Sequence, residues 1–330
     1  MLASLPRTTA EQTITHNNNK DSSMRAPTCT IAAGLLAVAA LSAARTSSAA
    51  YGAAYDTIYR IDLDKPAAST LGVAGRYQGQ TIANLSGLTT QPDGSLLAIA
   101  GTVKALVRID PGSGIATPIG PLGIDGGSGQ FDALDLGMTS SCHGVLYLAS
   151  GVQHTLYMVD PGSGSVTKIG DTGVAISGLA ERGGMLYGAG AKGDSTLYGI
   201  DPKTGATKAI GSFGSEATKW INSVSLSFDG SGTLWAMLNY VPPQAGSTTV
   251  PDWADLATID PKTGALHMVG PVNGPDSLRQ TGMKGFTVGP TPCVSATPQA
   301  YPVPAKSPWA TLLLGIALAG VALRSRRRAT

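Results

Sequence analysis

Residues 156–164 read Leu-Tyr-Met-Val-Asp-Pro-Gly-Ser-Gly, an apolar strand that runs into a tight turn. A further glycine, Gly170, follows the aspartate of this stretch by ten positions. The same Asp-to-Gly pair occurs five times, at intervals of 41 to 59 residues. A supersecondary unit repeated at such a spacing indicates units stacked around or along an axis. The five pairs are Asp62/Gly72, Asp110/Gly120, Asp160/Gly170, Asp201/Gly211 and Asp260/Gly270.

Each unit contains four short apolar strands, a to d. In the unit around Asp160 these strands are residues 134–138, 146–149, 156–160 and the run that ends at Gly170. In the Asp-Pro-x-Ser/Thr-Gly turn between strands c and d, Pro sets φ to about −65° and Gly supplies the positive φ that returns the chain antiparallel. Four antiparallel strands in about 40 to 50 residues are typical of a β-propeller blade.

The first unit lacks its strand a, because residues 51–53 match the strand b residues 187–189. Residues 282–288 read as a strand a with no b, c or d after it. The sequence therefore predicts an all-β, five-bladed propeller over residues 51–290, in which the last strand completes the first blade and removes free sheet edges. The units also resemble the LYxIDPxTG repeats of extracellular bacterial propellers, and that resemblance implies an exported protein.

The N-terminal 50 residues have the features of a leader and signal peptide. Met24 and Arg25 precede an apolar run over residues 31–43, and the small residues Ser48 and Ala50 suit signal peptidase. The run is too short to span a membrane comfortably. We therefore expect residues 1–50 to lie outside the folded domain.

The C-terminal end predicts a membrane anchor. Residues 309–323 form an uninterrupted apolar run, and an Arg-rich segment, residues 324–330, follows. Basic residues favour the cytoplasmic side, so the preceding domain is expected outside, with a single transmembrane helix and a cytoplasmic tail. Residues 291–308 are Pro-rich and read as a semi-stiff linker.

This end resembles the C-terminal sorting segments called PEP-CTERM and IPTL-CTERM. The matching positions are Val303, Pro304, Ser307, Trp309, Arg326, Arg327 and Arg328. Ala305 and Lys306 depart from the pattern. The resemblance implies an exosortase-like membrane enzyme as a partner in a Gram-negative bacterium. It also implies a periplasm-side inner-membrane intermediate, followed by release to the cell surface or outside. The alternative is an ordinary stop-transfer anchor.

Charge and cysteine content limit the partners. Residues 51–305 carry 14 Lys and Arg against 19 Asp and Glu, a net charge of −5, which argues against nucleic acid. We expect a monomer.

Cys142 lies in an a–b turn, and Cys293 follows the closing strand on the same face. In an oxidising compartment the two cysteines could pair and fasten the closure, or stay as free thiols.

Loops from strand d to a and from b to c share one face of a propeller, and here they vary in length and composition. Exposed aromatic and charged side chains on this face suit a glycan or protein ligand. The candidate ligand residues are Arg76, Tyr77, Asp132, Trp220, Tyr240, Trp253 and Arg279. The a–b and c–d turns are short and uniform, so the opposite face is predicted to be structural.

The chain offers little catalytic chemistry. His143, His154 and His267 have no metal-ligand spacing, and no catalytic residue or cofactor is predicted. The loop from Asp125 to Asp132 is a candidate for Ca²⁺, although its spacing lacks the calcium loop's closing Glu and favours a flexible loop.

Two functions remain open. The first is an exported, surface-sorted, non-catalytic propeller that acts as a binding or matrix-associated module. The alternative is a secreted hydrolase or lyase that acts on a carbohydrate through paired carboxylates at the axis.

Overall fold

The computed structural model of the chain describes residues 49–124, 134–190, 192–240, 254–275 and 282–294. These residues form β-strands joined by turns and loops. No helix in this part of the chain has the length and hydropathy needed to cross a membrane. The predicted transmembrane helix, residues 309–323, lies outside the described residues, as do residues 1–48 of the predicted leader.

Twenty-two strands are present in the described residues. In chain order they are β1 Ala50–Ala54, β2 Thr57–Asp62, β3 Ala67–Val73, β4 Arg76–Tyr77, β5 Gln80–Thr81, β6 Leu85–Thr90, β7 Leu96–Ala100, β8 Ala105–Ile109, β9 Ala116–Pro121, β10 Leu136–Ser140, β11 Leu146–Ser150, β12 Thr155–Val159, β13 Val166–Asp171, β14 Ile176–Arg182, β15 Met185–Gly190, β16 Thr196–Ile200, β17 Thr207–Ser212, β18 Ile221–Phe228, β19 Leu234–Tyr240, β20 Ala254–Ile259, β21 Leu266–Pro271 and β22 Gly285–Val288.

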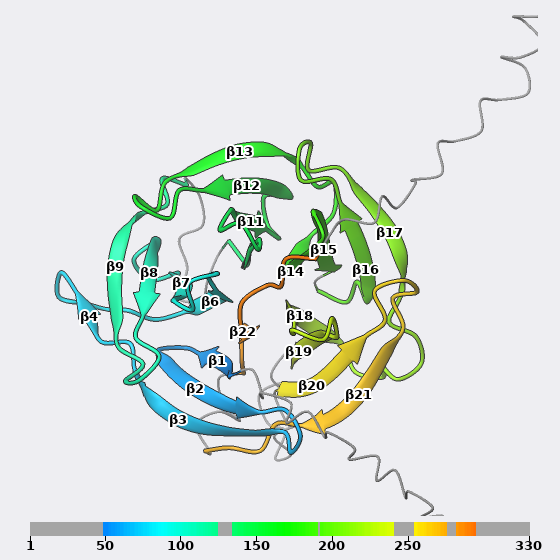
Figure 1. The fold of residues 1–330 in the computed structure, drawn as a ribbon, viewed down its shortest axis with the longest axis horizontal. Helices are drawn as coiled ribbons and strands as arrows, with labels where there is room; N and C mark the ends of the chain where they lie inside the picture. The colour runs from blue at the N-terminus through cyan, green and yellow to red at the C-terminus, as the bar shows by residue number, and fades with distance from the viewer. Residues whose placement is uncertain (1–48, 125–133, 191, 241–253, 276–281, 295–330) are drawn as a thin grey trace, which may run out of the picture. The chain divides into compact units, whose positions relative to one another are not determined.

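Twenty of these strands form five four-stranded sheets around a common axis, as Figure 1 shows. Blade 1 is β22-β1-β2-β3, and blades 2 to 5 are β6–β9, β10–β13, β14–β17 and β18–β21. Strands β4 and β5 form a separate small hairpin. The predicted five-bladed propeller is confirmed.

Blade 1 closes the ring by pairing the two ends of the domain. Strand β22 lies antiparallel to β1, with Ala50 opposite Val288 and Ala53 opposite Gly285. The predicted closing segment, residues 282–288, therefore does complete the first blade. Strand β1 begins at Ala50, the last residue of the segment assigned to the leader.

The core lies between neighbouring blades. Every residue of the inner strands β6 and β10 is buried, whereas the outer strand β13 has no buried residue. Between blades 2 and 3, one apolar cluster joins Ile99 and Leu106 of one sheet to Met138 and Leu148 of the next. Such face-to-face burial of aliphatic side chains is the main force that holds the sheets together.

Both glycines of the repeat are required at the contact between blades. Gly170 ends strand d of blade 3 and lies against the c–d turn of blade 4, where a Cβ would overlap the carbonyl oxygen of Thr204. The turn glycine Gly205, at φ +77°, lies against Gly170 in return. The same arrangement joins blades 1 to 2, 2 to 3 and 4 to 5, through Gly72 with Gly114, Gly120 with Gly164, and Gly211 with Gly264. The Asp-to-Gly spacing thus reflects close backbone approach between blades.

The fifth contact, between blades 5 and 1, is built differently. A Cβ added to Gly270 would have no atom within 4 Å, whereas at the other four glycines it would overlap the c–d turn of the next blade. The c–d turn of blade 1, residues 62–66, contains no glycine. Backbone hydrogen bonds take over: Ala68 N–H donates to the Asn273 carbonyl at 2.6 Å, and Asn273 N–H donates to Pro66 at 2.9 Å. The closing contact therefore departs from the repeat in both sequence and structure.

Small residues let the inner strands meet at the axis. A Cβ added to Gly137 would lie 2.6 Å from the Ser177 carbonyl oxygen, and one on Gly285 would lie 2.9 Å from Leu88 Cβ. The cavity that remains has a volume of about 10 Å³, at the lower limit for one water molecule. Glycine, leucine, methionine, serine and phenylalanine residues line it. The axis is therefore filled by the packed inner strands.

After β22, residues 289–294 cross the centre of the a–b face, and we call this segment the strap (Figure 1, orange). Pro290 forms a bridge with Thr90 of blade 2, and the Thr291 hydroxyl donates to the Ser140 carbonyl of blade 3 at 2.8 Å. Cys293 is then bonded to Cys142 of blade 3, with the two Cα atoms 5.0 Å apart. The pairing that the sequence left open is made, and it ties the closing strand to a blade two positions away.

The c–d turns predict how stability depends on pH. Hydrogen bonds from Ser113 lower the pKa of Asp110, and those from the Gly162 amide and Ser163 lower the pKa of Asp160. A carboxyl group with a folded pKa below its unfolded value of about 3.9 stabilises the fold when ionised. We therefore expect the urea midpoint to fall as the pH drops below about 4, and to fall less in Asp110→Asn. A midpoint that rises between pH 5 and 3 would contradict this.

Candidate functional site

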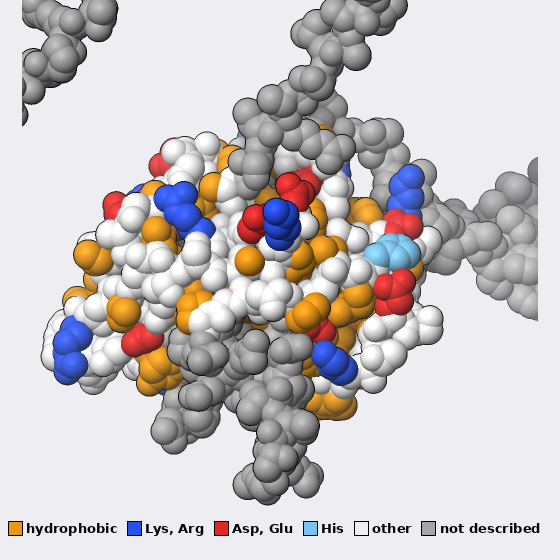
Figure 2. All heavy atoms as spheres, turned by 90° about the horizontal axis from the view of Figure 1, so that it is seen from below, with side chains coloured by type: hydrophobic (Ala, Val, Ile, Leu, Met, Phe, Trp, Pro, Cys, Tyr) orange, Lys and Arg blue, Asp and Glu red, His pale blue; other side chains and the backbone are white. Residues whose placement is uncertain are grey.

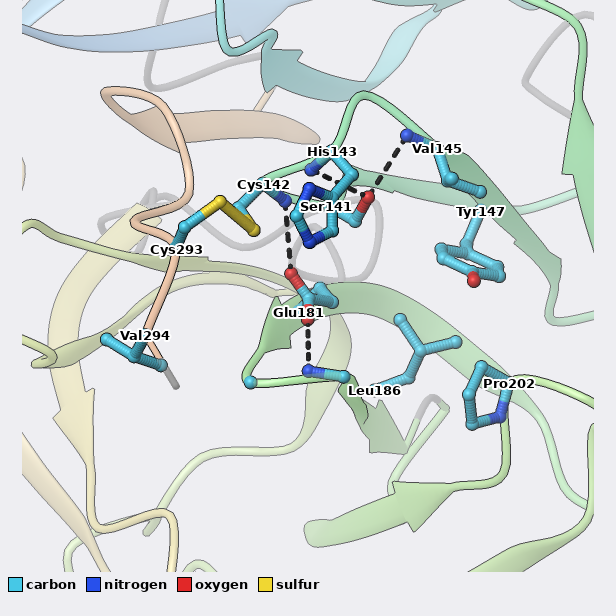
Figure 3. A pocket seen from close by; sticks show the side chains of 12 residues that line it. Ser141, Cys142, His143, Val145, Tyr147, Glu181, Leu186, Pro202, Cys293 and Val294 are labelled. Atoms are coloured by element: carbon cyan, nitrogen blue, oxygen red, sulfur yellow. Dashed lines mark hydrogen bonds between the residues drawn. A yellow bond between two sulfur atoms is a disulfide. The ribbon is translucent and has the colours of Figure 1, made fainter. Parts of the chain in front are cut away.

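A pocket of about 530 Å³ opens on the a–b face, beside the strap (Figure 3). Its lining combines the a–b turn of blade 3 with Tyr147 of β11, two turns of blade 4 (the β14–β15 hairpin and Pro202 of the c–d turn) and the end of the strap. We call it the strap pocket. Figure 3 shows Tyr147, Leu186 and Pro202 on one side, Cys293 and Val294 on the other, and Glu181 between them.

Among the described residues, Glu181 supplies the only carboxylate of the strap pocket, and no Lys or Arg lines it. Its side chain is 5% exposed. Each carboxylate oxygen accepts one backbone N–H: Oε1 from Gly184 at 2.6 Å, and Oε2 from Cys142 at 3.3 Å. No cation pairs with Glu181 among the described residues. The pocket therefore holds a buried carboxyl group that is hydrogen-bonded to backbone amides but has no cationic partner among the described residues.

Tyr147 lies on strand β11 and brings an aromatic ring to the same pocket. Burial, and then the nearby charge of Glu181, raise the pKa of the Tyr147 phenol. The phenol therefore stays protonated at neutral pH. With Leu186 and Pro202 it gives the pocket an apolar wall opposite the strap.

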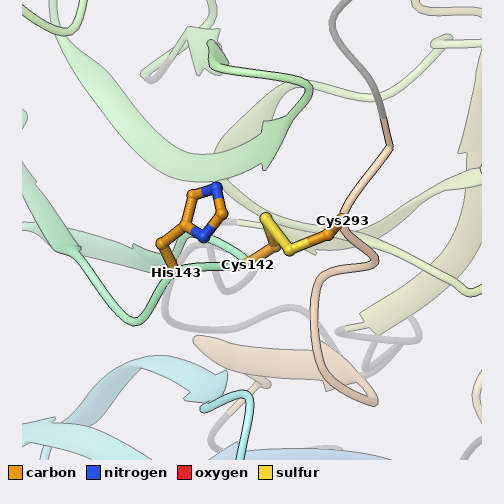
Figure 4. Close-up of side chains that lie close together, drawn as sticks. All are labelled: Cys142, His143 and Cys293. Atoms are coloured by element: carbon orange, nitrogen blue, oxygen red, sulfur yellow. A yellow bond between two sulfur atoms is a disulfide. The ribbon is translucent and has the colours of Figure 1, made fainter.

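Cys142, His143 and Cys293 bring their ligand atoms within 4.8 Å of one another, as Figure 4 shows. The spacing of His143 in the sequence did not predict this cluster. Two thiolates and an imidazole would suit Zn²⁺, but both sulfurs are bonded to each other here. The cluster in this structure is therefore a disulfide next to an exposed imidazole.

The opposite face carries a second candidate site around Trp220. The indole of Trp220 is 53% exposed and packs over the backbone of Gly193, where a Cβ would lie 2.5 Å from the indole nitrogen. The Gly193 amide in turn donates to the Ile221 carbonyl at 2.9 Å. The indole therefore rests on the Gly193 backbone, and about half of the residue's surface is exposed.

Lys219, the residue before Trp220, is held by groups of blade 5. Lys219 Nζ lies 3.1 Å from Asp255 Oδ2 and 4.6 Å from the centre of the Tyr240 ring. The Tyr240 hydroxyl donates to the same Asp255 oxygen at 2.6 Å, and burial, then this bond, raise the pKa of Tyr240. Asp255 Oδ1 is buried and has no hydrogen-bond partner among the described residues. We call Lys219, Trp220, Tyr240 and Asp255 the Trp220 cluster.

The structure brings some of the predicted ligand residues together and separates others. Trp220 and Tyr240 belong to the Trp220 cluster, although Tyr240 is only 6% exposed and holds Asp255 instead of facing solvent. Arg76 and Tyr77 form the exposed strand β4, which Figure 1 places at the rim of the ring, away from β18 to β20.

The other predicted residues lie outside the described residues. These are Asp132, Trp253, Arg279, the candidate calcium loop from Asp125 to Asp132, and the sorting positions Val303, Pro304, Ser307, Trp309, Arg326, Arg327 and Arg328.

The strap pocket lies on the face that the sequence predicted to be structural. Its short, uniform turns gave no sign of a cavity, because the pocket forms where three segments distant in sequence meet. One feature of the sequence could have pointed to this site: Glu181 is one of only two glutamates between residues 51 and 305.

The charged side chains on the surface are of mixed sign. Figure 2 shows basic and acidic side chains interspersed on the side of the molecule that it presents.

Residues 87–241 match the family described as a repeat of unknown function (DUF6923). In the structure the matched residues run from strand β6 of blade 2 to the end of strand β19 in blade 5. The matched repeat thus forms blades of the five-bladed propeller. No curated protein matches the sequence.

Several solved structures are similar to this chain at low sequence identity. A chain of the nidogen/laminin complex is 13% identical, with 74% of this chain and 99% of that chain covered and a TM-score of 0.45. Virginiamycin B lyase from Staphylococcus aureus is 12% identical, with 68% and 71% covered and a TM-score of 0.39. Kuenenia stuttgartiensis hydrazine synthase is 17% identical, with 59% of this chain covered and a TM-score of 0.37. This chain spans about half (53%) of that one. Likenesses at this level assign no function.

Proposed function

We propose that the chain is an exported, surface-sorted, non-catalytic propeller that binds a carbohydrate through the Trp220 cluster. The observation that carries the proposal is the exposed indole of Trp220, which packs on Gly193 and follows directly in sequence on Lys219, the partner of Asp255. An open aromatic face gives an apolar platform for a sugar ring, and fixed polar groups beside it orient the hydroxyls.

Two further features support export and a binding role. The Cys142–Cys293 bond suits an oxidising compartment outside the cytoplasm. The axis, where a propeller hydrolase or lyase would assemble its carboxylates, is lined by Gly, Leu, Met, Ser and Phe residues. Under this proposal an exosortase-like membrane enzyme reads the C-terminal segment, and the domain reaches the cell surface or the surrounding matrix.

The carbohydrate site predicts a specific loss on substitution. In a glycan array with the full chain, we expect binding to at least one carbohydrate class, and Trp220→Ala should weaken it roughly tenfold or more, because it removes the stacking surface. Met158→Ala, which removes a similarly exposed apolar side chain on blade 3, serves as the matched control and should bind as the wild type does. A folded wild-type chain that binds no glycan, or a Trp220→Ala variant with unchanged affinity, would contradict the proposal.

A further inference from the structure

The strap pocket plays no part in carbohydrate binding at the Trp220 cluster, because it lies on the opposite face. Its volume of about 530 Å³ falls within the range of small-molecule sites. Its walls come from Val145, Leu186, Pro202 and Val294, and Glu181 lies between them. A largely apolar cavity with one buried, unneutralised carboxylate has the character of a binding site for a particular kind of ligand.

We propose that the strap pocket binds a primary ammonium group that carries an apolar body. The ammonium would neutralise Glu181, whose oxygens each accept one backbone N–H and keep further acceptor capacity. A charge-assisted hydrogen bond to a carboxylate in a sheltered site is stronger than a neutral one. The apolar body would contact Leu186, Pro202 and Val294.

The aromatic ring of Tyr147 also favours a cation. Ammonium groups are attracted to the face of an aromatic ring, and the attraction grows when the site is sheltered from water. Tyr147 and Glu181 line the same pocket. An anion would meet Glu181, and His143 is the only basic side chain among the described residues of the lining.

A metal ion fits the strap pocket less well. Hard cations such as Ca²⁺ take six to eight oxygen ligands, and Glu181 is the only carboxylate in the lining. Soft metal ions need thiolates, and the two sulfurs at the rim are joined in the disulfide. An organic ammonium requires only the single carboxylate and the apolar walls that are present.

The test is calorimetric titration of the full, oxidised chain with phenethylammonium chloride. The matched neutral probe is phenethyl alcohol, which has the same aromatic body without the charge. Nα-acetyl-lysine amide forms a second arm and represents a lysine side chain of a protein partner. We expect phenethylammonium or the lysine amide to bind at least about tenfold more tightly than the alcohol.

Glu181→Gln removes the charge and nearly preserves the shape of the side chain. We expect this variant to lose the preference for the ammonium while its affinity for the alcohol stays the same. Its circular dichroism spectrum and melting temperature check that it is folded. If Glu181→Gln does not fold, the affinities of the wild type for the charged and the neutral probe still test the proposal. Three results would overturn the proposal: equal affinity of the wild type for the ammonium probes and phenethyl alcohol, no binding of either ammonium, or an unchanged preference for the ammonium over the alcohol in folded Glu181→Gln.

Discussion

Removing the Cys142–Cys293 bond is expected to lower the free energy of unfolding by about 5 kcal/mol, at the upper end for a single disulfide. The bond joins cysteines 151 residues apart, so it restricts most of the unfolded domain. Chain-entropy estimates grow with the logarithm of the closed loop, which gives about 5 kcal/mol at this length. The bond also holds the strap across blades 1 to 3, so its loss frees the closing strand β22 to leave the sheet.

The measurement is urea unfolding of Cys142→Ser, Cys293→Ser and the double variant, each without reductant. Because each single change breaks the same bond, all three variants should lose the same stability. The matched control is the wild type in reductant, which should behave like the variants. A change below about 1 kcal/mol, or single variants that differ strongly from the double variant, would show that the bond does not constrain the ring.

Gly170→Ala is expected to lower the free energy of unfolding by about 3 kcal/mol, as overpacking against a rigid neighbour does. The added Cβ would overlap the carbonyl oxygen of Thr204 in the next blade, and the Thr204 carbon would lie only 2.8 Å away. Those atoms belong to backbone, so they cannot move aside by a change of side-chain conformation. The φ of Gly170 lies outside the left-handed region, so the cost is steric.

Gly230→Ala is the matched control for the contact between blades. Gly230 lies in an a–b turn, has no neighbouring atom within 4 Å of an added Cβ, and also has an ordinary φ. This change should be neutral or slightly stabilising, because alanine restricts the unfolded chain more than glycine does. If Gly170→Ala were as stable as Gly230→Ala in urea, the repeated glycines would have some other cause than close approach of the blades.

The number of blades and their closure were predictable because the repeat contains residues that the geometry requires. Each Asp-Pro-x-Ser/Thr-Gly turn needs its glycine both for a positive φ and for contact with the glycine of the preceding blade. The contact from blade 5 to blade 1 lacks this pattern at residues 62–66, where Asn273 takes over by backbone hydrogen bonds. The missing turn glycine is visible in the sequence, but the hydrogen bonds of Asn273 have no counterpart elsewhere in the repeat and could not be predicted from it.

The candidate sites were less predictable. Trp220 was recognised as a bulky aromatic in a variable loop, but its position over Gly193 depends on how two loops of neighbouring blades meet. Tyr240 was expected at the ligand surface, and instead burial and Asp255 hold it in the domain. The strap pocket depends on where residues 289–294 cross the ring, which only the three-dimensional course of the chain determines.

Native-state hydrogen exchange tests the closed ring most directly. If β22 is an integral strand of blade 1, its amides exchange only when the whole domain unfolds, with the same opening free energy as the amides of β14 in blade 4. The result that would contradict the closed ring is rapid exchange throughout residues 285–288 while β14 remains fully protected.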